Sequence, residues 1–276
     1  MDIIQRNFFR LIRVGVFEKQ EQVEPMSAYK WSKLYQLAMM HQVAGDIYKG
    51  LLNCKNQFFF HLTDKQWNLW ENTINELQNT KENDDEEEDE LLKADHLTNP
   101  LLNRKFQSIL DDENSDTRTR QLLLMITRTS RHILNEGFPV RQLVALGSYI
   151  RKENNHIDYA MLGKWLQDLK LQKIAQLQGA LLTEWFGFES DEIPFASKKT
   201  DPNVTRVAQE LIEFTNARVR NFYFTQDADS IFVHTNNGSA MLGHMRRSTR
   251  YFRYYPSETL TNFFASFAHS LSHIEE

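Results

Sequence analysis

Three arginines and two tyrosines near the C-terminus are the residues whose types could bind a nucleic acid. Arg246, Arg250 and Arg253 share one face of an expected helix, where their guanidinium groups could hold phosphates. Tyr251 or Tyr255 could stack on bases. We favour a simpler interpretation, an exposed helix whose arginines pair with surface carboxylates. The chain carries a net charge of −5, whereas nucleic-acid-binding domains are usually basic.

Residues that could hold a metal ion are sparse. His269 and His273 stand at positions i and i+4 of an expected C-terminal helix, but no third ligand lies nearby in the sequence. Cys54 is the single cysteine, which excludes an intramolecular disulfide and any multi-cysteine zinc site. We therefore expect no metal and no cofactor, and a reducing compartment, the cytoplasm.

Three helices with clear starts and ends fill residues 137–195. Pro139 fits the first turn of one, Asp158 is expected to cap the second, and Gly187 ends the third. Apolar side chains recur at helical spacing along this stretch, including Val140, Leu143, Val144, Gly147, Leu162, Trp165, Leu166, Leu169, Leu171, Ile174, Leu177, Leu181, Leu182 and Trp185.

The first 80 residues show the same helical pattern. Ser27 is expected to be the N-cap of one helix, and another helix follows Thr63. Phe58, Phe59 and Phe60 are consecutive, and we expect all three rings to pack in the core, since buried positions are the usual place for clustered aromatic residues.

The composition favours helices throughout. Only 10 glycines and 6 prolines occur in 276 residues, which is too few for the many turns of a β-sandwich or barrel. We predict an all-α fold, a bundle-like array of many helices, with residues 222–234 as the best candidate for one small β-hairpin. Purely apolar runs are short, so we expect neither a signal peptide nor a membrane span.

Residues 84–90 are seven consecutive acidic residues. Because adjacent like charges repel and stay solvated, residues 81–96 are predicted to be an acidic linker between an N-terminal helical part, 1–80, and a C-terminal helical domain, 97–276. The alternative, a site for basic partners or divalent ions, lacks the spaced ligands of a calcium loop. The sequence leaves open whether the run contacts the basic segment 245–255.

Seven stretches of the chain share a pattern with a known family, namely residues 31–51, 99–107, 137–143, 157–159, 169–173, 185–187 and 192–195. They resemble an uncharacterised nucleotidyltransferase family of Bacteroidetes, and the resemblance extends over most of the chain. The resemblance is to the helical N-terminal and C-terminal parts of that family, which enclose a mixed α/β catalytic core.

That catalytic core is not found in this sequence. In the family it supplies a Gly-Ser or Gly-Gly turn and two acids at i and i+2 of a strand, which together hold Mg²⁺. Gly147, Ser148 and Asp158 imitate this spacing, but Ala160 replaces the second acid and the surrounding pattern is helical. Two other acid pairs lack a glycine turn upstream, namely Asp111 with Glu113 and Asp227 with Asp229.

A second, weaker resemblance concerns Arg151 and His156, whose Arg-x4-His spacing is similar to the site of HEPN-type ribonucleases. The same spacing arises where a helix ends in arginine and a histidine follows in the loop, and we favour that origin.

The sequence therefore predicts a non-catalytic helical protein, related to nucleotidyltransferases, that acts through contacts with an unknown protein partner. The enzymatic alternatives are residual nucleotidyl transfer and ribonuclease chemistry at Arg151 and His156. The remaining alternative is single-stranded nucleic-acid binding through residues 245–255.

Overall fold

The computed structural model describes residues 1–93, 96–135, 140–196 and 252–261. Within these ranges the chain is helical and contains no strand, which confirms the predicted all-α class. The hairpin predicted at 222–234 lies outside the described residues, as do His269 and His273. None of the described helices combines the length and the apolar character needed to cross a lipid bilayer.

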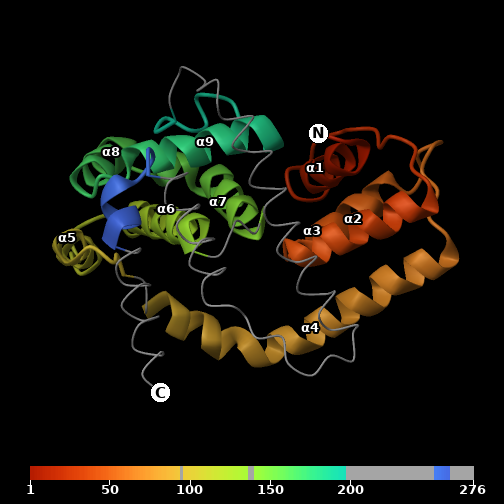
Figure 1. Cartoon of the computed structure of the whole chain (residues 1–276), viewed down its shortest axis with the longest axis horizontal. Helices are drawn as coiled ribbons and strands as arrows, with labels where there is room; N and C mark the ends of the chain where they lie inside the picture. Colours follow the sequence, from red (N-terminus) through yellow and green to blue (C-terminus); the bar gives the residue numbers. More distant parts are fainter. Residues whose placement is uncertain (94–95, 136–139, 197–251, 262–276) are drawn as a thin grey trace.

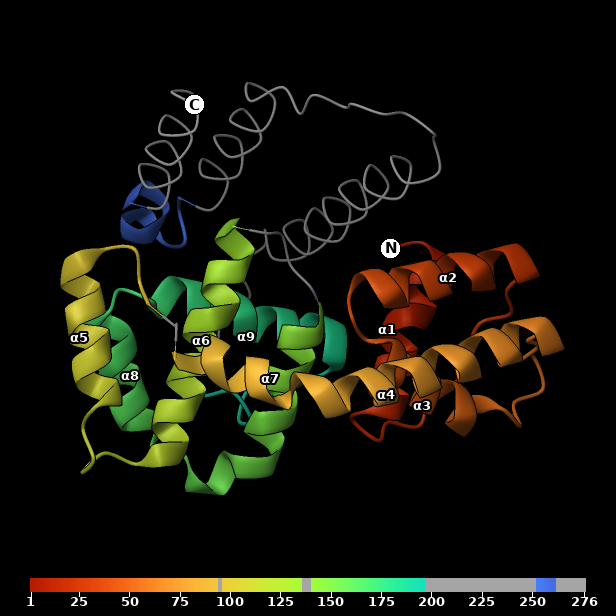
Figure 2. The same cartoon turned by 90° about the horizontal axis from the view of Figure 1, so that it is seen from below.

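The helices form two groups joined by one long helix. Their bounds are α1 Ile3–Gly15, α2 Ala28–Met40, α3 Ala44–Cys54, α4 Asp64–Lys93, α5 Pro100–Leu110, α6 Thr117–Asn135, α7 Val140–Glu153, η1 Asn154–His156, α8 Tyr159–Asp168 and α9 Gln172–Phe186. Figures 1 and 2 show α1–α3 at one end of the molecule and α5–α9 at the other, with α4 running along the outside between them.

The helix ends follow from local side-chain chemistry. Ser27 and Asp158 accept hydrogen bonds from the N–H groups of Lys30 and Met161, at 3.5 and 2.8 Å, so both predicted N-caps are confirmed. Gly187 ends α9 with a φ of 66°, a left-handed conformation in which a residue with a Cβ would be strained.

The two groups share one apolar core. Phe9 of α1 stacks on Trp185 of α9 with ring centroids 4.8 Å apart, and Phe17 lies 5.1 Å from Phe186. The side chain of His41 accepts a hydrogen bond at Nδ1 from the Val140 N–H, 3.3 Å away, at the start of α7. The parts predicted as 1–80 and 97–276 therefore pack against each other, while the boundary between them stays a prediction.

The predicted linker is helical over most of its length. Residues 81–93 continue α4, which runs for 30 residues from Asp64 to Lys93, so this part of the predicted linker is a helix and not a loop. Glutamate and leucine are good helix formers. Repulsion between like charges one turn apart costs only about 0.2–0.5 kcal/mol per pair, which is too little to break a helix that has already begun.

Two glutamates fasten segment 16–27 to α1. Arg6 donates two hydrogen bonds of 2.8 Å to the Glu24 carboxylate, which Arg10 also contacts, and Arg13 binds Glu21. The hydrogen bond from Arg6 is the main reason that the pKa of Glu24 falls from 4.5 to about 2. The carboxylate therefore stays ionised in the folded protein well below its ordinary range.

This pairing predicts an acid-sensitive contribution to stability. Because the pKa of Glu24 is lowered on folding, its contribution is complete above pH 4.5 and is lost as the pH falls from there towards about 2. The Glu24→Gln variant should melt below the wild type at neutral pH, and thermal unfolding should show this gap closing as the pH falls below 4.5. Glu71→Gln, at an exposed position of α4, is the control. A gap that stayed constant across the acid range would contradict the assignment.

Candidate functional site: an exposed aromatic pair between α3 and α4

Two adjacent phenylalanines project from the turn that joins α3 to α4. Phe58 is 84% exposed and Phe59 is 58% exposed, and their rings meet edge to face with centroids 4.9 Å apart. Leu52 on the last turn of α3 is also exposed. Burying a phenylalanine side chain is worth about 1.5–3 kcal/mol, so two exposed neighbouring rings forgo a large stabilisation in the isolated chain.

On the N-terminal side of this pair, Gln57 anchors the turn through hydrogen bonds. Its backbone N–H donates to the Cys54 carbonyl at 2.9 Å. Its side chain accepts from the Val23 N–H at 2.8 Å and donates to the Glu21 carbonyl at 2.7 Å. The turn is thus bound to segment 16–27, which the arginines of α1 hold in turn.

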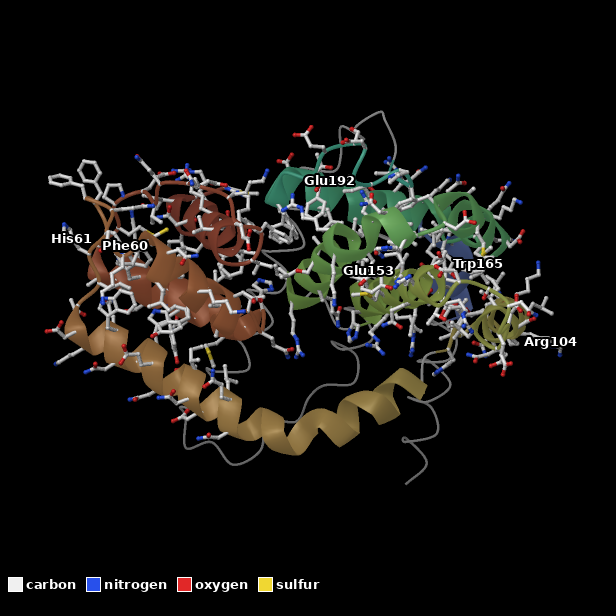
Figure 3. All side chains as sticks on the ribbon, turned by 180° about the vertical axis from the view of Figure 1, so that it is seen from behind. Phe60, His61, Arg104, Glu153, Trp165 and Glu192 are labelled. Atoms are coloured by element: carbon white, nitrogen blue, oxygen red, sulfur yellow. The ribbon has the colours of Figure 1, made fainter. Side chains whose placement is uncertain are left out.

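On the C-terminal side of the pair, Phe60 anchors the turn by packing in the core. It is buried, and its ring lies 5.3 Å from Trp31 of α2 and 6.0 Å from Trp67 of α4. Figure 3 shows Phe60 and His61 at one end of the molecule, opposite the end that carries Arg104 and Trp165. Contacts on both flanks thus anchor the backbone that carries the two exposed rings, which lowers the entropy cost of ordering this turn on binding.

The expectation that all three phenylalanines pack in the core was therefore wrong for Phe58 and Phe59. The three phenylalanines lie in the nine-residue connection between the end of α3 at Cys54 and the start of α4 at Asp64. Of the three, only Phe60 reaches the core. The position of this connection between two helix ends was the signal that could have found the exposed pair.

The two residues of the ribonuclease-like spacing have separate partners. The guanidinium of Arg151 lies 4.1 Å from the Phe188 ring and 4.9 Å from the Phe17 ring, and its Nε donates to Glu192 at 2.9 Å. His156 instead lies 3.7 Å from the Glu153 carboxylate, on the 3-10 turn after α7.

Arg151 acts as a packing residue in this arrangement. Partial burial opposes ionisation of Glu192, but hydrogen bonds from Arg151 and from the Glu189 N–H outweigh it, so the pKa of Glu192 lies below its ordinary value. The resulting ion pair joins α7 to the segment after α9, and the guanidinium packs against two aromatic rings. Its geometry is explained without a substrate.

Little of the basic segment lies in the described residues. Arg246, Arg250 and Tyr251 are outside them. Residues 252–254 form a turn rather than part of the expected helix, and residues 256–261 are helical. The residue before a proline disfavours the helical conformation, which explains the break. Arg253 lies on this turn, with its guanidinium 5.4 Å from the Tyr254 ring.

Tyr255 cannot stack on a base. It is fully buried, and its hydroxyl donates to the Leu169 carbonyl at 3.2 Å. Burial raises the pKa of this phenol far above its ordinary value. The proposal of Tyr255 as a stacking residue was wrong, because the side chain fixes the turn 252–254 to the end of α8.

The other candidate residues, Gly147, Asp158 and Cys54, have structural roles. Gly147 lies inside α7, where an added Cβ would stand 2.9 Å from the Phe188 ring, and Asp158 caps α8. Burial raises the pKa of the Cys54 thiol to about 11, so the thiol stays protonated at neutral pH. In the part of the chain that the structure describes, no three His, Cys, Asp or Glu side chains gather closely enough to hold a metal ion.

A shallow pocket beside α1 is lined by Arg6, Arg10, Arg13, Phe9 and Trp185 together with Met1 and Glu184. Its arginines already bind Glu21 and Glu24, and Arg13 also donates to the Trp185 carbonyl at 2.5 Å. The pocket is therefore lined by the same arginines that bind segment 16–27 to α1.

The described residues thus define an all-α protein that presents a fixed pair of aromatic rings at one end. No family model, curated protein or solved structure matches the chain.

Proposed function

We propose that this chain is a non-catalytic helical protein that acts through protein–protein contacts, with Phe58 and Phe59 as its contact point. The observation that carries the proposal is the exposure of two touching aromatic rings on a turn anchored by Gln57 and Phe60. Aromatic residues dominate the energetics of protein interfaces, particularly where they are held in the binding conformation before the partner arrives.

A relation to nucleotidyltransferases is part of this proposal and is supported by the sequence likeness alone. Gly147 and Ser148, which imitate the family's glycine turn, lie inside α7, and Asp158 caps α8. A magnesium-binding pair of acids on a strand has no counterpart at this place. A helical array that keeps the family's packing without its reaction centre would function as a binding scaffold.

The Phe58→Ser/Phe59→Ser variant should lose partner binding while keeping its stability. Both rings are exposed, so the free energy of unfolding should change by no more than about 0.5 kcal/mol. Partner recovery should fall by about tenfold or more when tagged chains are purified from cells that make the protein. Denaturant unfolding and quantitative co-purification are the two measurements.

Leu101→Ser is the matched control, because Leu101 is 73% exposed on α5, in the other helical group. It should bind the same partner as the wild type. Equal recovery of the partner by the double variant and the control would contradict the proposal. Specific binding or transfer of a labelled nucleoside triphosphate in the presence of Mg²⁺ would contradict the proposal that the protein is non-catalytic, since a scaffold has no such activity.

A further inference from the structure

The chain segment that carries the aromatic pair contains basic residues and no acidic residue. From Ile47 to Thr63 the chain contains two lysines and one histidine, but no aspartate or glutamate. Lys49 and Lys55 are both exposed, and the ammonium of Lys55 lies 5.2 Å from the Trp67 ring. The docking surface, defined as Lys49, Leu52, Lys55, Phe58 and Phe59, therefore fits an acidic partner that also offers apolar contact.

The chain itself contains a segment of that chemistry. Residues 84–90 are all acidic, are followed by Leu91 and Leu92, and lie on the second half of α4. They cannot reach the docking surface of their own chain. A helix rises about 1.5 Å per residue, so residue 84 is about 30 Å along α4 from Asp64, several times the Debye length of about 8 Å at physiological salt.

We infer that the occupant of the docking surface is the acidic half of α4 from a second copy of this chain, an inference that rests on the proposed function. Figures 1 and 2 show α4 on the outside of the molecule, where a second copy can approach it. A two-fold axis places each docking surface against the other copy's residues 84–90. The two contacts are equivalent and close the assembly as a dimer.

Two exposed leucines support this arrangement. Leu69 is 44% exposed and Leu77 is 40% exposed, and both lie on α4 between the docking surface and the acidic run. Charge at the two ends sets the antiparallel register of the two copies, and apolar contact supplies affinity.

The first test is sedimentation velocity on the full chain from about 1 µM to about 100 µM. We expect a dimer whose dissociation constant rises about tenfold or more between about 50 mM and about 500 mM NaCl, because salt screens the paired charges. Phe58→Ser/Phe59→Ser should weaken the dimer about tenfold or more, and Leu101→Ser should leave it unchanged.

The second test exchanges the charges. Lys49→Glu/Lys55→Glu makes the docking surface acidic, and Glu86→Lys/Glu87→Lys/Glu90→Lys makes the run basic with residues of similar helix propensity. Each variant alone should be monomeric, because both of its contacts then join like charges. An equal mixture of the two should form a dimer, because both contacts join opposite charges again.

Three results would overturn the inference: a wild type that stays monomeric, a charge-exchanged variant that dimerises alone, or open-ended polymers. A monomeric wild type whose co-purified partner is lost on Phe58→Ser/Phe59→Ser would show that a different protein occupies the surface, and the proposed function would stand. A salt-sensitive dimer that is restored only in the mixture supports the inference.

Discussion

Gly50→Ala should destabilise the protein by about 3 kcal/mol, since the added methyl group has no room. A Cβ on Gly50 would stand 2.2 Å from the carbonyl oxygen of Leu11, a backbone atom of α1. Gly15 makes the reciprocal approach, where a Cβ would lie 2.3 Å from the Asp46 carbonyl oxygen of α3. Helices α1 and α3 would have to separate. This would also move the arginines of α1 that bind segment 16–27.

Gly45→Ala provides the control in the same helix. Nothing lies within 4 Å of a Cβ at Gly45, so alanine there should raise stability by about 0.5–1 kcal/mol through its better helix propensity. Urea unfolding of both variants, followed by circular dichroism, measures the difference. Equal stabilities would show that the backbones of α1 and α3 are not in close contact.

Trp185→Ala should cost about 3–5 kcal/mol, the range for removing a large buried aromatic side chain. Trp185 is 1% exposed and stacks on Phe9, which is 2% exposed, at the junction between the two helical groups. If the groups share one core, the variant should still unfold in a single transition, shifted to lower denaturant concentration. Unfolding followed by fluorescence and by circular dichroism should give coincident curves.

Trp165→Ala removes the same side chain from a half-buried position on α8 and should cost clearly less. Two separated transitions in the Trp185→Ala variant, or in the wild type, would mean that the N-terminal and C-terminal helical groups unfold independently. The boundary predicted near residues 81–96 would then mark two domains. A single transition in both proteins would instead assign the two groups to one cooperative unit.

The helix ends that depend only on residues nearby in the sequence could be predicted. The N-caps at Ser27 and Asp158 and the glycine end of α9 follow from hydrogen bonds and backbone preferences within one helical turn. The all-α class followed from the scarcity of turn residues and from apolar spacing, which are also local properties.

The prediction for the acidic run considered the repulsion between like charges and left out helix propensity. Like charges suggested a loop at residues 81–96, but helix propensity and the helix already begun at Asp64 carry α4 on to Lys93. Repulsion between neighbouring side chains was overestimated, because water screens each pair.

The sequence by itself determined the helix ends at Ser27, Asp158 and Gly187 and the apolar stripes that the helices bury. Only the tertiary structure decided which aromatic residues face the core: Phe60 meets Trp31 and Trp67, while Phe58 and Phe59 remain outside. The reason is that a helix is specified by contacts within a few residues, whereas burial depends on which distant segments arrive at the same place. The candidate contact site exists because Gln57 and Phe60 are anchored to segments remote in sequence.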